Sequence, residues 1–375
     1  MAATPRVLIV GAGLAGLSLA IALRNHGIRA QIIERADQWS PVGAGIYLVG
    51  NAMRALDTLG LANRVLNDGA YIPTQAILSG KGKTLTQVDT EHFWKECGPC
   101  VCIRRSDLHE LLIDELGDLP VRFSTTIEDI REIDQSPLVR FSTGETQEFD
   151  LVVGADGIRS SVRHILYPDI HPQYCGYMGW RFIVPRPDAI SSWTVVNGSA
   201  GAFVLIPVSR DDVYCYADSG PSDTFDDPVE GRIERLKARF RTYPDMVLET
   251  LAEVRSDADI HFGAIEELMV DPPSKGHVVL IGDAAHASAP NMASGAAMAF
   301  KDSIVLARLI ASAPRLDTAL HDYAKARLPR TRWVQSQTHR RDAMRRLPPW
   351  LVHPLTRLIS KRAYVSNYKP LLDAI

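Results

Sequence analysis

A glycine-rich turn near the N-terminus constrains the fold of this chain more than any other feature. The apolar run Arg6–Val10 leads directly into Gly11-Ala12-Gly13-Leu14-Ala15-Gly16. The segment from Leu17 to His26 is rich in Ala and Leu, with apolar residues at helical spacing. Gly27 ends this predicted helix, and Arg29–Glu34 is a second predicted buried strand. The pattern predicts a strand–helix–strand unit with the glycines at its first turn.

The three glycines are expected to have different roles in that unit. Gly11 permits the tight turn, Gly13 lets the backbone approach a pyrophosphate, and Gly16 lets the helix pack on the strand. The pyrophosphate would lie at the helix N-terminus, where free N–H groups and the helix dipole favour an anion. Glu34 follows Gly11 by 23 residues and would accept hydrogen bonds from the adenosine ribose. The pattern therefore predicts a dinucleotide site rather than glycines that merely shape a turn.

Length and composition indicate the number of domains and the broad class of protein. A chain of 375 residues with 46% hydrophobic residues is expected to form two domains with a substantial core. Its net charge of −3 gives no indication of nucleic-acid binding. The run Val7–Val10 is too short for a signal peptide, and no stretch reaches the ~20 apolar residues of a bilayer span. A cytoplasmic protein is expected.

The five cysteines are Cys97, Cys100, Cys102, Cys175 and Cys215. Their odd number and spacing do not resemble a disulfide framework. The first three are close enough to suggest a redox or zinc pair, but no second Cys or His pair has a matching spacing. Buried, unreactive thiols and no metal site are the favoured interpretation.

The later chain predicts a second, strand-rich domain inserted into the first. Predicted strands rich in apolar or β-branched residues are Leu138–Phe141, Phe149–Gly154, Val195–Val196, Ala202–Val208 and Val213–Ala217. A buried strand at Lys275–Gly282 and a helix at Gly295–Ala313 then return to the nucleotide-binding fold. The expected fold class is α/β with an α+β substrate domain: a Rossmann-like domain interrupted by a β-sheet domain, with C-terminal helices. The expected divisions are residues 1–71, 101–168 and 275–335 for the nucleotide-binding domain, 72–100 and 169–274 for the substrate domain, and 336–375 for the C-terminal helical segment.

Two further stretches carry a family resemblance. They are Gly154-Ala155-Asp156-Gly157, and Leu280-Ile281-Gly282-Asp283 continuing through Pro290 to Gly295. With the first glycine motif, they resemble the single-component (group A) FAD-dependent aromatic hydroxylases over nearly the whole chain. Alkylquinolone hydroxylases are the most similar in these features, and urate and salicylate hydroxylases are less so.

The resemblance implies a set of FAD-binding residues. Arg105 would contact the phosphate–ribose region, and Asp156 would serve both FAD and the nicotinamide cofactor. Asp283 would bind the ribityl and pyrophosphate portion, and Pro290 begins a loop whose N–H groups would face the isoalloxazine and stabilise negative charge. The implied set is Gly11, Gly13, Ala15, Gly16, Glu34, Arg35, Gly45, Arg105, Asp156, Gly282, Asp283, Pro290, Gly295 and Ala296.

That loop departs from the family pattern. The family commonly has Pro-Asn-Leu-Gly-Gln-Gly, whereas this chain has Pro290-Asn291-Met292-Ala293-Ser294-Gly295. Alanine in place of glycine preserves the backbone contacts only if the dihedral angles at Ala293 are unstrained.

Two residues of the substrate domain are candidates for the catalytic site. Tyr214 matches a tyrosine that faces the substrate in the relatives, and strand alternation places Tyr216 on the same side. Arg181 belongs to a stretch that resembles a strand lining the active-site mouth. Ala202 stands where urate and alkylquinolone hydroxylases carry an arginine, next to the apolar strand Phe203–Pro207. A neutral aromatic substrate is therefore expected, unless Arg181 supplies the cation.

The resemblance implies an NAD(P)H-dependent monooxygenase. Bound FAD, transient NADPH or NADH, and O2 would hydroxylate a small aromatic or heteroaromatic substrate through a flavin C4a-hydroperoxide. A flavin-dependent halogenase is an alternative, because Trp180-x-Phe182-x-Val184-Pro185 distantly resembles a motif of that class. A non-redox FAD protein that binds a ligand or guides a cyclisation is another. A monomer or a homodimer is expected.

The segment from Lys325 to Lys369 is strongly basic. It includes Arg340, Arg341, Arg345 and Arg346, together with an apolar stripe at Trp350, Leu351, Leu355, Leu358 and Ile359. A basic amphipathic helix can lie on an anionic membrane surface. A helix packed over the FAD domain with a solvated face is the favoured alternative.

Overall fold

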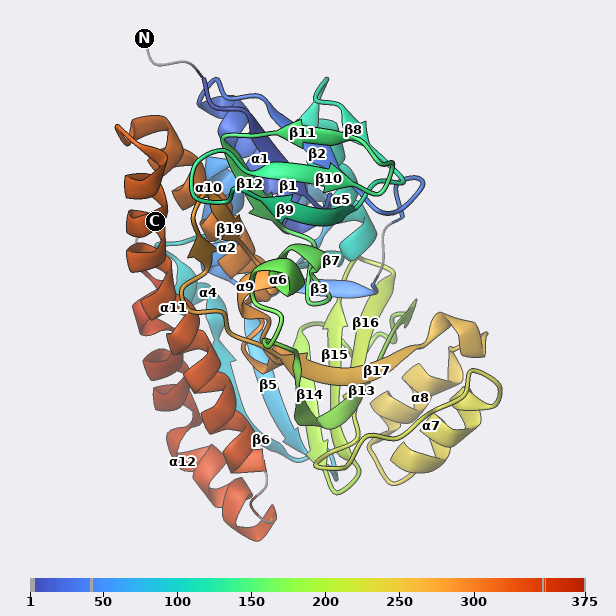
Figure 1. Cartoon of the computed structure of the whole chain (residues 1–375). Coiled ribbons are helices and arrows are strands. Elements are labelled where there is room, and N and C mark those ends of the chain that lie inside the picture. Colours follow the sequence, from blue (N-terminus) through green and yellow to red (C-terminus); the bar gives the residue numbers. More distant parts are fainter. Residues whose placement is uncertain (1–3, 41–42, 346, 348, 374–375) are drawn as a thin grey trace.

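A six-stranded sheet forms the nucleotide-binding part of the molecule (Figure 1). The computed structural model describes residues 4–40, 43–345, 347 and 349–373. In spatial order the sheet consists of β18 (Ser274–Lys275), β19 (Val278–Leu280), β12 (Leu151–Gly154), β1 (Val7–Val10), β2 (Ala30–Ile33) and β8 (Val121–Arg122). All neighbouring pairs are parallel except β18 with β19. This is the Rossmann-like sheet that the glycine motif predicted.

The central strand of this sheet joins segments that are far apart in the sequence. Val7 of β1 is in register with Ala30 of β2 on one side and with Leu151 of β12 on the other. Every residue of β1 is buried, because helices or other strands cover both faces of a parallel sheet. Helix α1 (Leu14–Asn25) begins three residues before the predicted start at Leu17. The helix starts directly after Gly13.

Two small sheets lie beside the first one. One consists of β9 (Ile127–Arg131), β10 (Leu138–Phe141) and β11 (Thr146–Glu148), all antiparallel. The other consists of β3 (Gly45–Leu48), β7 (Val101–Arg104) and β4 (Ala70–Tyr71). In Figure 1, β3 and β7 lie between the nucleotide-binding sheet and the large sheet below it.

The second large unit is a seven-stranded sheet. In spatial order its strands are β17 (His261–Glu267), β13 (Gln173–Pro185), β16 (Asp212–Asp218), β15 (Gly201–Pro207), β14 (Trp193–Gly198), β5 (Thr74–Ser79) and β6 (Thr84–Asp89). It is antiparallel apart from the pair β14 and β5. This sheet confirms the predicted strand-rich unit, whereas the exact domain limits stay a prediction.

Strand alternation separates the two faces of this sheet. Trp180, Phe182 and Phe203 belong to a core cluster that includes residues of α7 (Arg232–Phe240) and α8 (Asp245–Ala252). The residues between them face the other way, toward the nucleotide-binding part. The halogenase-like residues Trp180, Phe182 and Val184 therefore form hydrophobic core, and the Trp180 indole donates to Asp227 at 2.7 Å.

The remaining helices surround the sheets. They are α2 (Gly50–Thr58), α3 (Ala62–Asp68), α4 (Thr90–Trp94), α5 (Arg105–Leu116), α6 (Ser161–Leu166), α9 (Asp283–His286) and α10 (Gly295–Ser312), with 3-10 turns η1 (Asp257–Asp259), η2 (Pro290–Met292) and η3 (Lys369–Leu371). Helix α10 packs against both α1 and α2.

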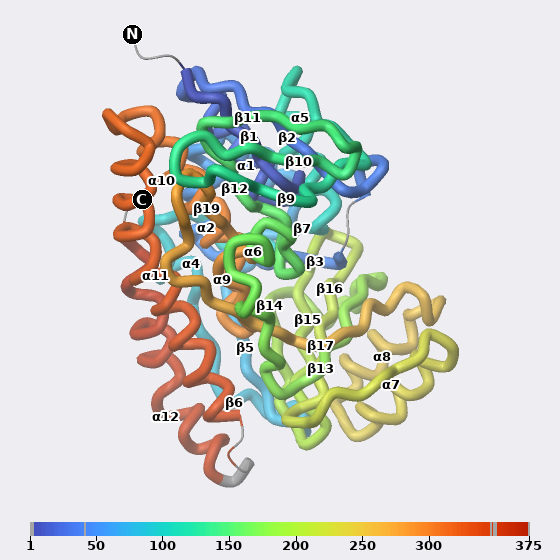
Figure 2. Tube along the Cα trace, in the orientation of Figure 1, coloured from blue at the N-terminus to red at the C-terminus, as the bar shows by residue number. Residues whose placement is uncertain are grey.

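The C-terminal segment differs from the expectation. Helix α11 (Leu316–Arg345) is continuous across the boundary expected between 335 and 336 and packs against α10. Helix α12 (Pro349–Tyr368) packs against β6 of the substrate sheet rather than over the FAD domain. The reason is an aromatic cluster in which Tyr364 and Tyr368 contact Phe93 and Trp94. Figure 2 shows both helices along one side of the molecule.

The outer face of α12 carries exposed apolar side chains, including Leu358, which is 77% exposed. Arg346 and the side chain of Trp350 lie outside the described residues. Within the described part of the chain, no helix is both long and apolar enough to cross a membrane. All five cysteines are free, and all except Cys175 are buried.

Candidate active site

The glycine turn has the geometry that its sequence predicted. Gly11 has φ +102°, and a Cβ there would lie 2.6 Å from the Ala155 carbonyl oxygen. A Cβ on Gly16 would overlap the Gly11 carbonyl oxygen, so Gly16 allows the close contact of helix and turn. A Cβ on Gly13, in contrast, would meet no atom of the described residues within 4 Å. The turn is therefore closed toward the rest of the protein at Gly11 and Gly16 but open at Gly13, and no described side chain caps α1 there.

Other segments converge on this turn. The Glu34 carboxylate accepts from the Ala12 N–H at 2.8 Å and from the Ala36 N–H at 3.0 Å. The His109 Nε2 lies 2.8 Å from the Ala12 carbonyl oxygen. Glu34 is therefore held at the end of β2, beside the N-terminus of α1, as its spacing from Gly11 predicted.

Asp156 lies next to the same turn but has extensive local bonding. A Cβ on Gly11 would lie 2.9 Å from the Asp156 Cα. The Asp156 carboxylate accepts from the Ser160 hydroxyl at 2.5 Å and from the Ser161 N–H at 2.7 Å. The carboxylate thus binds the first N–H group of α6 and the side chain of its N-cap residue, Ser160. The assignment of Asp156 to FAD and nicotinamide binding did not include this structural role.

Gly282 and Asp283 bring the third motif to α1. A Cβ on Gly282 would lie 3.0 Å from the Ala15 Cβ, so the two motifs are in contact. The Asp283 side chain is exposed and has no hydrogen bond within the part of the chain that the structure describes. It begins α9 and is available to a ligand.

A buried network of charged side chains binds the backbone of the Gly282-Asp283 motif. Asp302 on α10 is fully buried and accepts from the Gly282 N–H at 2.9 Å. Its carboxylate also lies 2.6 Å from the His286 Nε2 and accepts from Arg327 at 2.6 Å. Burial alone would raise the pKa of Asp302, but the charges of His286 and Arg327 outweigh it and lower the pKa to about 2.

The Pro290 loop contains a strained alanine. Ala293 follows η2 with φ +46°, in the left-handed region that favours glycine. The condition of an unstrained dihedral at Ala293 is therefore not met. Within the part of the chain that the structure describes, a Cβ on Gly295 would meet nothing within 4 Å, and no side chain caps the start of α10. Ala296 follows in the first turn of this helix and is partly buried.

The C-terminal helices hold this loop in place. The Asn291 amide donates to Asp342 at 2.8 Å and to the Thr338 carbonyl at 3.2 Å. The Tyr368 hydroxyl donates to the Met292 carbonyl at 3.0 Å. The loop position therefore depends on α11 and α12 as well as on its own sequence.

Three further predicted cofactor residues, Arg105, Arg35 and Gly45, lie at or near the starts or ends of helices and strands. Arg105 begins α5 with an exposed side chain, and a Cβ on Gly43 would lie 2.8 Å from the Arg105 Cδ. Arg35 is exposed just after β2. Gly45 begins β3, and a Cβ there would overlap the Tyr214 ring. Gly45 therefore lies next to the candidate catalytic tyrosine.

The two candidate catalytic residues lie close together on the face of the large sheet opposite α7 and α8. Tyr216 is in register with Arg181, and Tyr214 with the adjacent Ile183. The Arg181 guanidinium carbon lies 5.5 Å from the Tyr216 ring centre, a cation–π contact. Burial raises the pKa of the Tyr214 hydroxyl to about 12, and the Arg181 charge acts in the opposite direction. The Tyr216 hydroxyl is buried and has no hydrogen-bond partner within the described residues.

The surroundings of Ala202 correct an expectation. The Ala202 N–H donates to Asp218 at 3.1 Å, and Arg345 donates to both oxygens of Asp218 at 2.6 Å. A fixed cation therefore does stand near Ala202, supplied from α11 rather than from the strand. Because Asp218 is fully buried and pairs with it, the local charge is balanced.

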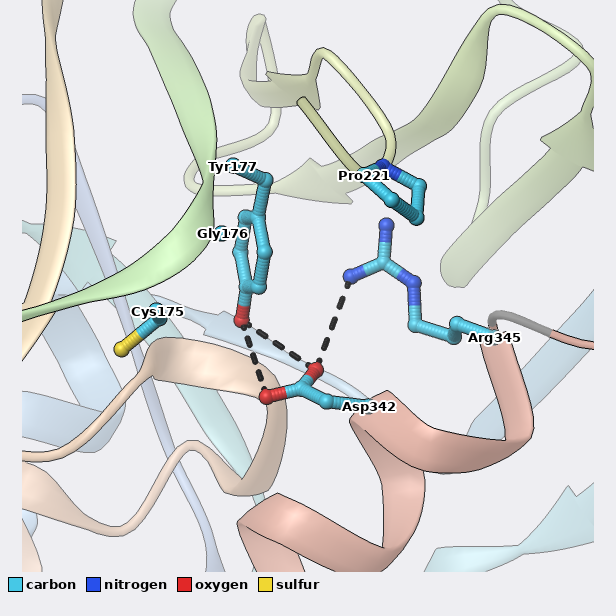
Figure 3. Close-up of a pocket in the computed structure, with 6 residues that line it drawn as sticks. All are labelled: Cys175, Gly176, Tyr177, Pro221, Asp342 and Arg345. Carbon is cyan, nitrogen blue, oxygen red and sulfur yellow. Dashed lines mark hydrogen bonds and ion pairs between the residues drawn. The ribbon is translucent and has the colours of Figure 1, made fainter. Parts of the chain in front are cut away.

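A small cavity lies beside this ion pair (Figure 3). Its lining includes Tyr177, Asp342 and Arg345. The Tyr177 hydroxyl lies 3.3 Å from Asp342, and Arg345 lies 4.0 Å from the same carboxylate. A volume of about 10 Å³ is room for roughly one water molecule, so this cavity does not hold an aromatic substrate.

Several supporting residues could not be identified from the sequence. Asp302, Arg327, Asp342 and Tyr368 are not part of any local motif that indicates a cofactor site. Their contacts span from about sixteen to more than seventy positions along the chain. Asp302 is the exception that offered a signal, because a carboxylate in the mainly apolar helix Gly295–Ala313 requires a partner where it is buried.

The chain belongs to the family described as FAD binding domain, whose model matches residues 4–338. It is an FAD-binding flavoprotein monooxygenase, a class that uses NAD(P)H. This membership favours neither the halogenase nor the non-redox alternative.

Two sequence relatives and one solved structure are similar to most of the chain. The chain is 33% identical over 335 residues to aurachin C monooxygenase/isomerase of Stigmatella aurantiaca, covering 86% of this chain and 85% of that protein. It is 32% identical over 335 residues to 2-heptyl-3-hydroxy-4(1H)-quinolone synthase of Pseudomonas aeruginosa, covering 88% and 87%. The structure of Klebsiella pneumoniae HpxO complexed with FAD and uric acid matches with a TM-score of 0.85 and 21% identity, covering 99% and 93%. That structural likeness concerns the fold.

Proposed function

We propose that this protein hydroxylates a neutral, largely apolar heteroaromatic ring of the quinolone type. The proposal rests on one observation above all: among the described residues, the buried Tyr216 hydroxyl has no hydrogen-bond partner. The ion pair near it on the same sheet, Asp218 with Arg345, is charge-balanced. A buried hydroxyl without a partner is costly, and a polar group on a substrate would satisfy it. The names of the relatives, an aurachin monooxygenase and a quinolone synthase, favour the same substrate class.

The FAD would be held by the three convergent motifs. Open space at Gly13 and at Gly295 leaves the starts of α1 and α10 free to face phosphate and flavin oxygens. The exposed carboxylate of Asp283 would accept hydrogen bonds from the ribityl chain or ribose, and Glu34 would do the same at the adenosine ribose. Arg105 would add a positive charge near the phosphates. The residues present fit this cofactor.

The bound flavin would supply the redox and oxygen chemistry, and the protein would orient the ring. Tyr214 stays protonated at neutral pH, because burial raises its pKa to about 12. Its hydroxyl and that of Tyr216 would position the substrate through hydrogen bonds. Arg181 would stabilise negative charge that develops on a substrate oxygen, since its guanidinium lies at this tyrosine pair.

The decisive experiment measures substrate-stimulated NAD(P)H oxidation with matched pairs of aromatic compounds. Each pair differs by one carboxylate, and wild type, Arg181→Ala and Tyr216→Phe are compared. Wild type is expected to prefer the neutral compound of each pair. Tyr216→Phe is expected to raise KM for that compound while FAD affinity stays unchanged.

A preference of wild type for the carboxylated compounds would contradict the neutral substrate. If Arg181→Ala then lost that preference, Arg181 would be identified as the cation that binds an anionic substrate. If no aromatic compound stimulated NAD(P)H oxidation, hydroxylation itself would be in question.

A further inference from the structure

A cavity of about 160 Å³ lies between α10 and α11, away from the tyrosine pair. Its charged lining residues are all cations: Lys301 and Arg308 from α10, and Arg327 and Arg330 from α11. The rest of the lining is apolar and includes Met298, also from α10. None of the roles assigned to the FAD or substrate site uses this cavity.

Lys301 is the unusual member of this group. It is only 5% exposed and has no hydrogen bond or ion pair within the described residues. Its neighbours differ, because Arg327 donates to Asp302 and Arg330 donates to Asp373. Burial, together with repulsion from Arg54 and the two other arginines, lowers the pKa of Lys301 to about 8. A buried ammonium without a partner is unfavourable unless a ligand compensates it.

We propose that this cavity is a binding site for a small anion of the sulfate or phosphate class, with the Lys301 ammonium as its central donor. The anion would accept charge-assisted hydrogen bonds from Lys301 and from the arginines that line the cavity. Such a ligand would also relieve the repulsion among these cations. The apolar remainder of the lining suits a compact ion better than a long acidic chain.

The position of the site connects it to the flavin motif. Arg327 lines the cavity and also holds Asp302, which accepts from the Gly282 N–H. An anion that binds Arg327 would therefore change the contact between Arg327 and Asp302, the residue that holds the Gly282 N–H. By linkage, anion binding and FAD binding should then alter each other's affinity by the same factor.

Isothermal titration of the FAD-loaded protein with sodium sulfate at constant ionic strength tests the proposal. Wild type is expected to bind about one sulfate per chain. Lys301→Met should weaken this binding roughly tenfold or more, whereas Lys301→Arg should retain it. Lys81→Met, which removes an exposed lysine of the β5–β6 turn, is the matched control and should bind like wild type.

The pH dependence gives a second readout. Sulfate keeps its charge between pH 6 and 9, so affinity should fall as pH rises through about 8, where Lys301 loses its proton. Arg54, Arg327 and Arg330 are the other cations around Lys301, and burial raises the pKa of the nearby Cys97 thiol. The pKa of Asp302 is lowered to about 2, so its carboxylate stays ionised throughout this range.

Equal sulfate binding by wild type and Lys301→Met would overturn the proposal, as would the absence of saturable binding to wild type. If Lys301→Met does not fold, Arg330→Gln provides the same comparison, because its side chain is partly exposed at the cavity. Unchanged binding in Arg330→Gln together with no fall in affinity above pH 8 would likewise exclude the site.

Discussion

The Arg345 guanidinium on α11 donates to both carboxylate oxygens of Asp218 at 2.6 Å, across 127 positions of sequence. Asp218 is the last residue of β16 and is fully buried. The pair connects helix α11 to the strand that carries Tyr214 and Tyr216.

Replacing Arg345 by Met should destabilise the protein by about 3–5 kcal/mol, because the Asp218 charge then stays buried without a partner. Denaturant unfolding of the FAD-loaded protein measures this difference. The double variant Asp218→Asn/Arg345→Met should recover part of the loss. If the single variant is as stable as wild type, the ion pair does not hold the helix to the sheet.

Gly13→Val should fold but lose FAD. A Cβ at Gly13 meets no atom of the described residues within 4 Å, yet it would occupy the space that a pyrophosphate requires. Far-UV circular dichroism and the flavin absorbance of the purified protein check both parts. Gly16→Val is the contrasting variant, which should fail to fold because its side chain overlaps the Gly11 carbonyl. A yellow Gly13→Val protein would contradict the assignment.

Asp283→Ala should weaken FAD binding by roughly 1.5–3 kcal/mol, the value for a hydrogen bond to a charged group. This corresponds to a Kd that is about tenfold to a hundredfold higher, measured by flavin fluorescence titration of the apoprotein. Asp188→Ala removes another exposed carboxylate, in the loop after β13, and should leave the Kd unchanged. An unaltered Kd in Asp283→Ala would leave Asp283 as a turn residue only.

Ala293→Gly should stabilise the protein by about 1 kcal/mol. An L-residue at φ +46° is strained by roughly 1–2 kcal/mol, part of which the greater freedom of glycine in the unfolded chain offsets. The free energy of unfolding at 25 °C gives the answer. Ala296→Gly, in the following helix, should instead destabilise, by about 0.5–1 kcal/mol. Equal destabilisation by both changes would show that the Ala293 backbone is unstrained.

The pH dependence of stability should show the contribution of the ionised Asp302 carboxylate. Its pKa is lowered from 3.8 to about 2 in the folded protein. The unfolded chain therefore binds the proton first as pH falls, so the stabilisation is complete above pH 4 and is lost as pH falls through 2. Unfolding free energies between pH 5 and 2.5 should fall more steeply for wild type than for Asp302→Asn. If the two proteins showed the same pH dependence of the unfolding free energy, Asp302 would not contribute to stability through this charge network.

The local motifs determined the nucleotide-binding half of this protein from sequence alone. The strand Val7–Val10, the turn at Gly11 and the acid at Glu34 lie within one supersecondary unit, and short-range sterics and hydrogen bonding fix their geometry. The strand alternation that places Tyr214 and Tyr216 on one face is equally local. Such features depend on neighbours a few residues away, so a sequence pattern can report them.

Only the tertiary structure decided the charges around the site. Ala202 predicted a face without a fixed cation, yet Arg345 on α11 lies near it and is balanced by Asp218. The left-handed conformation of Ala293 was equally hidden, and so was the burial of Lys301 without a partner among the described residues. Electrostatic partners and backbone strain arise where distant segments pack together, and no periodicity in the sequence encodes which segments meet.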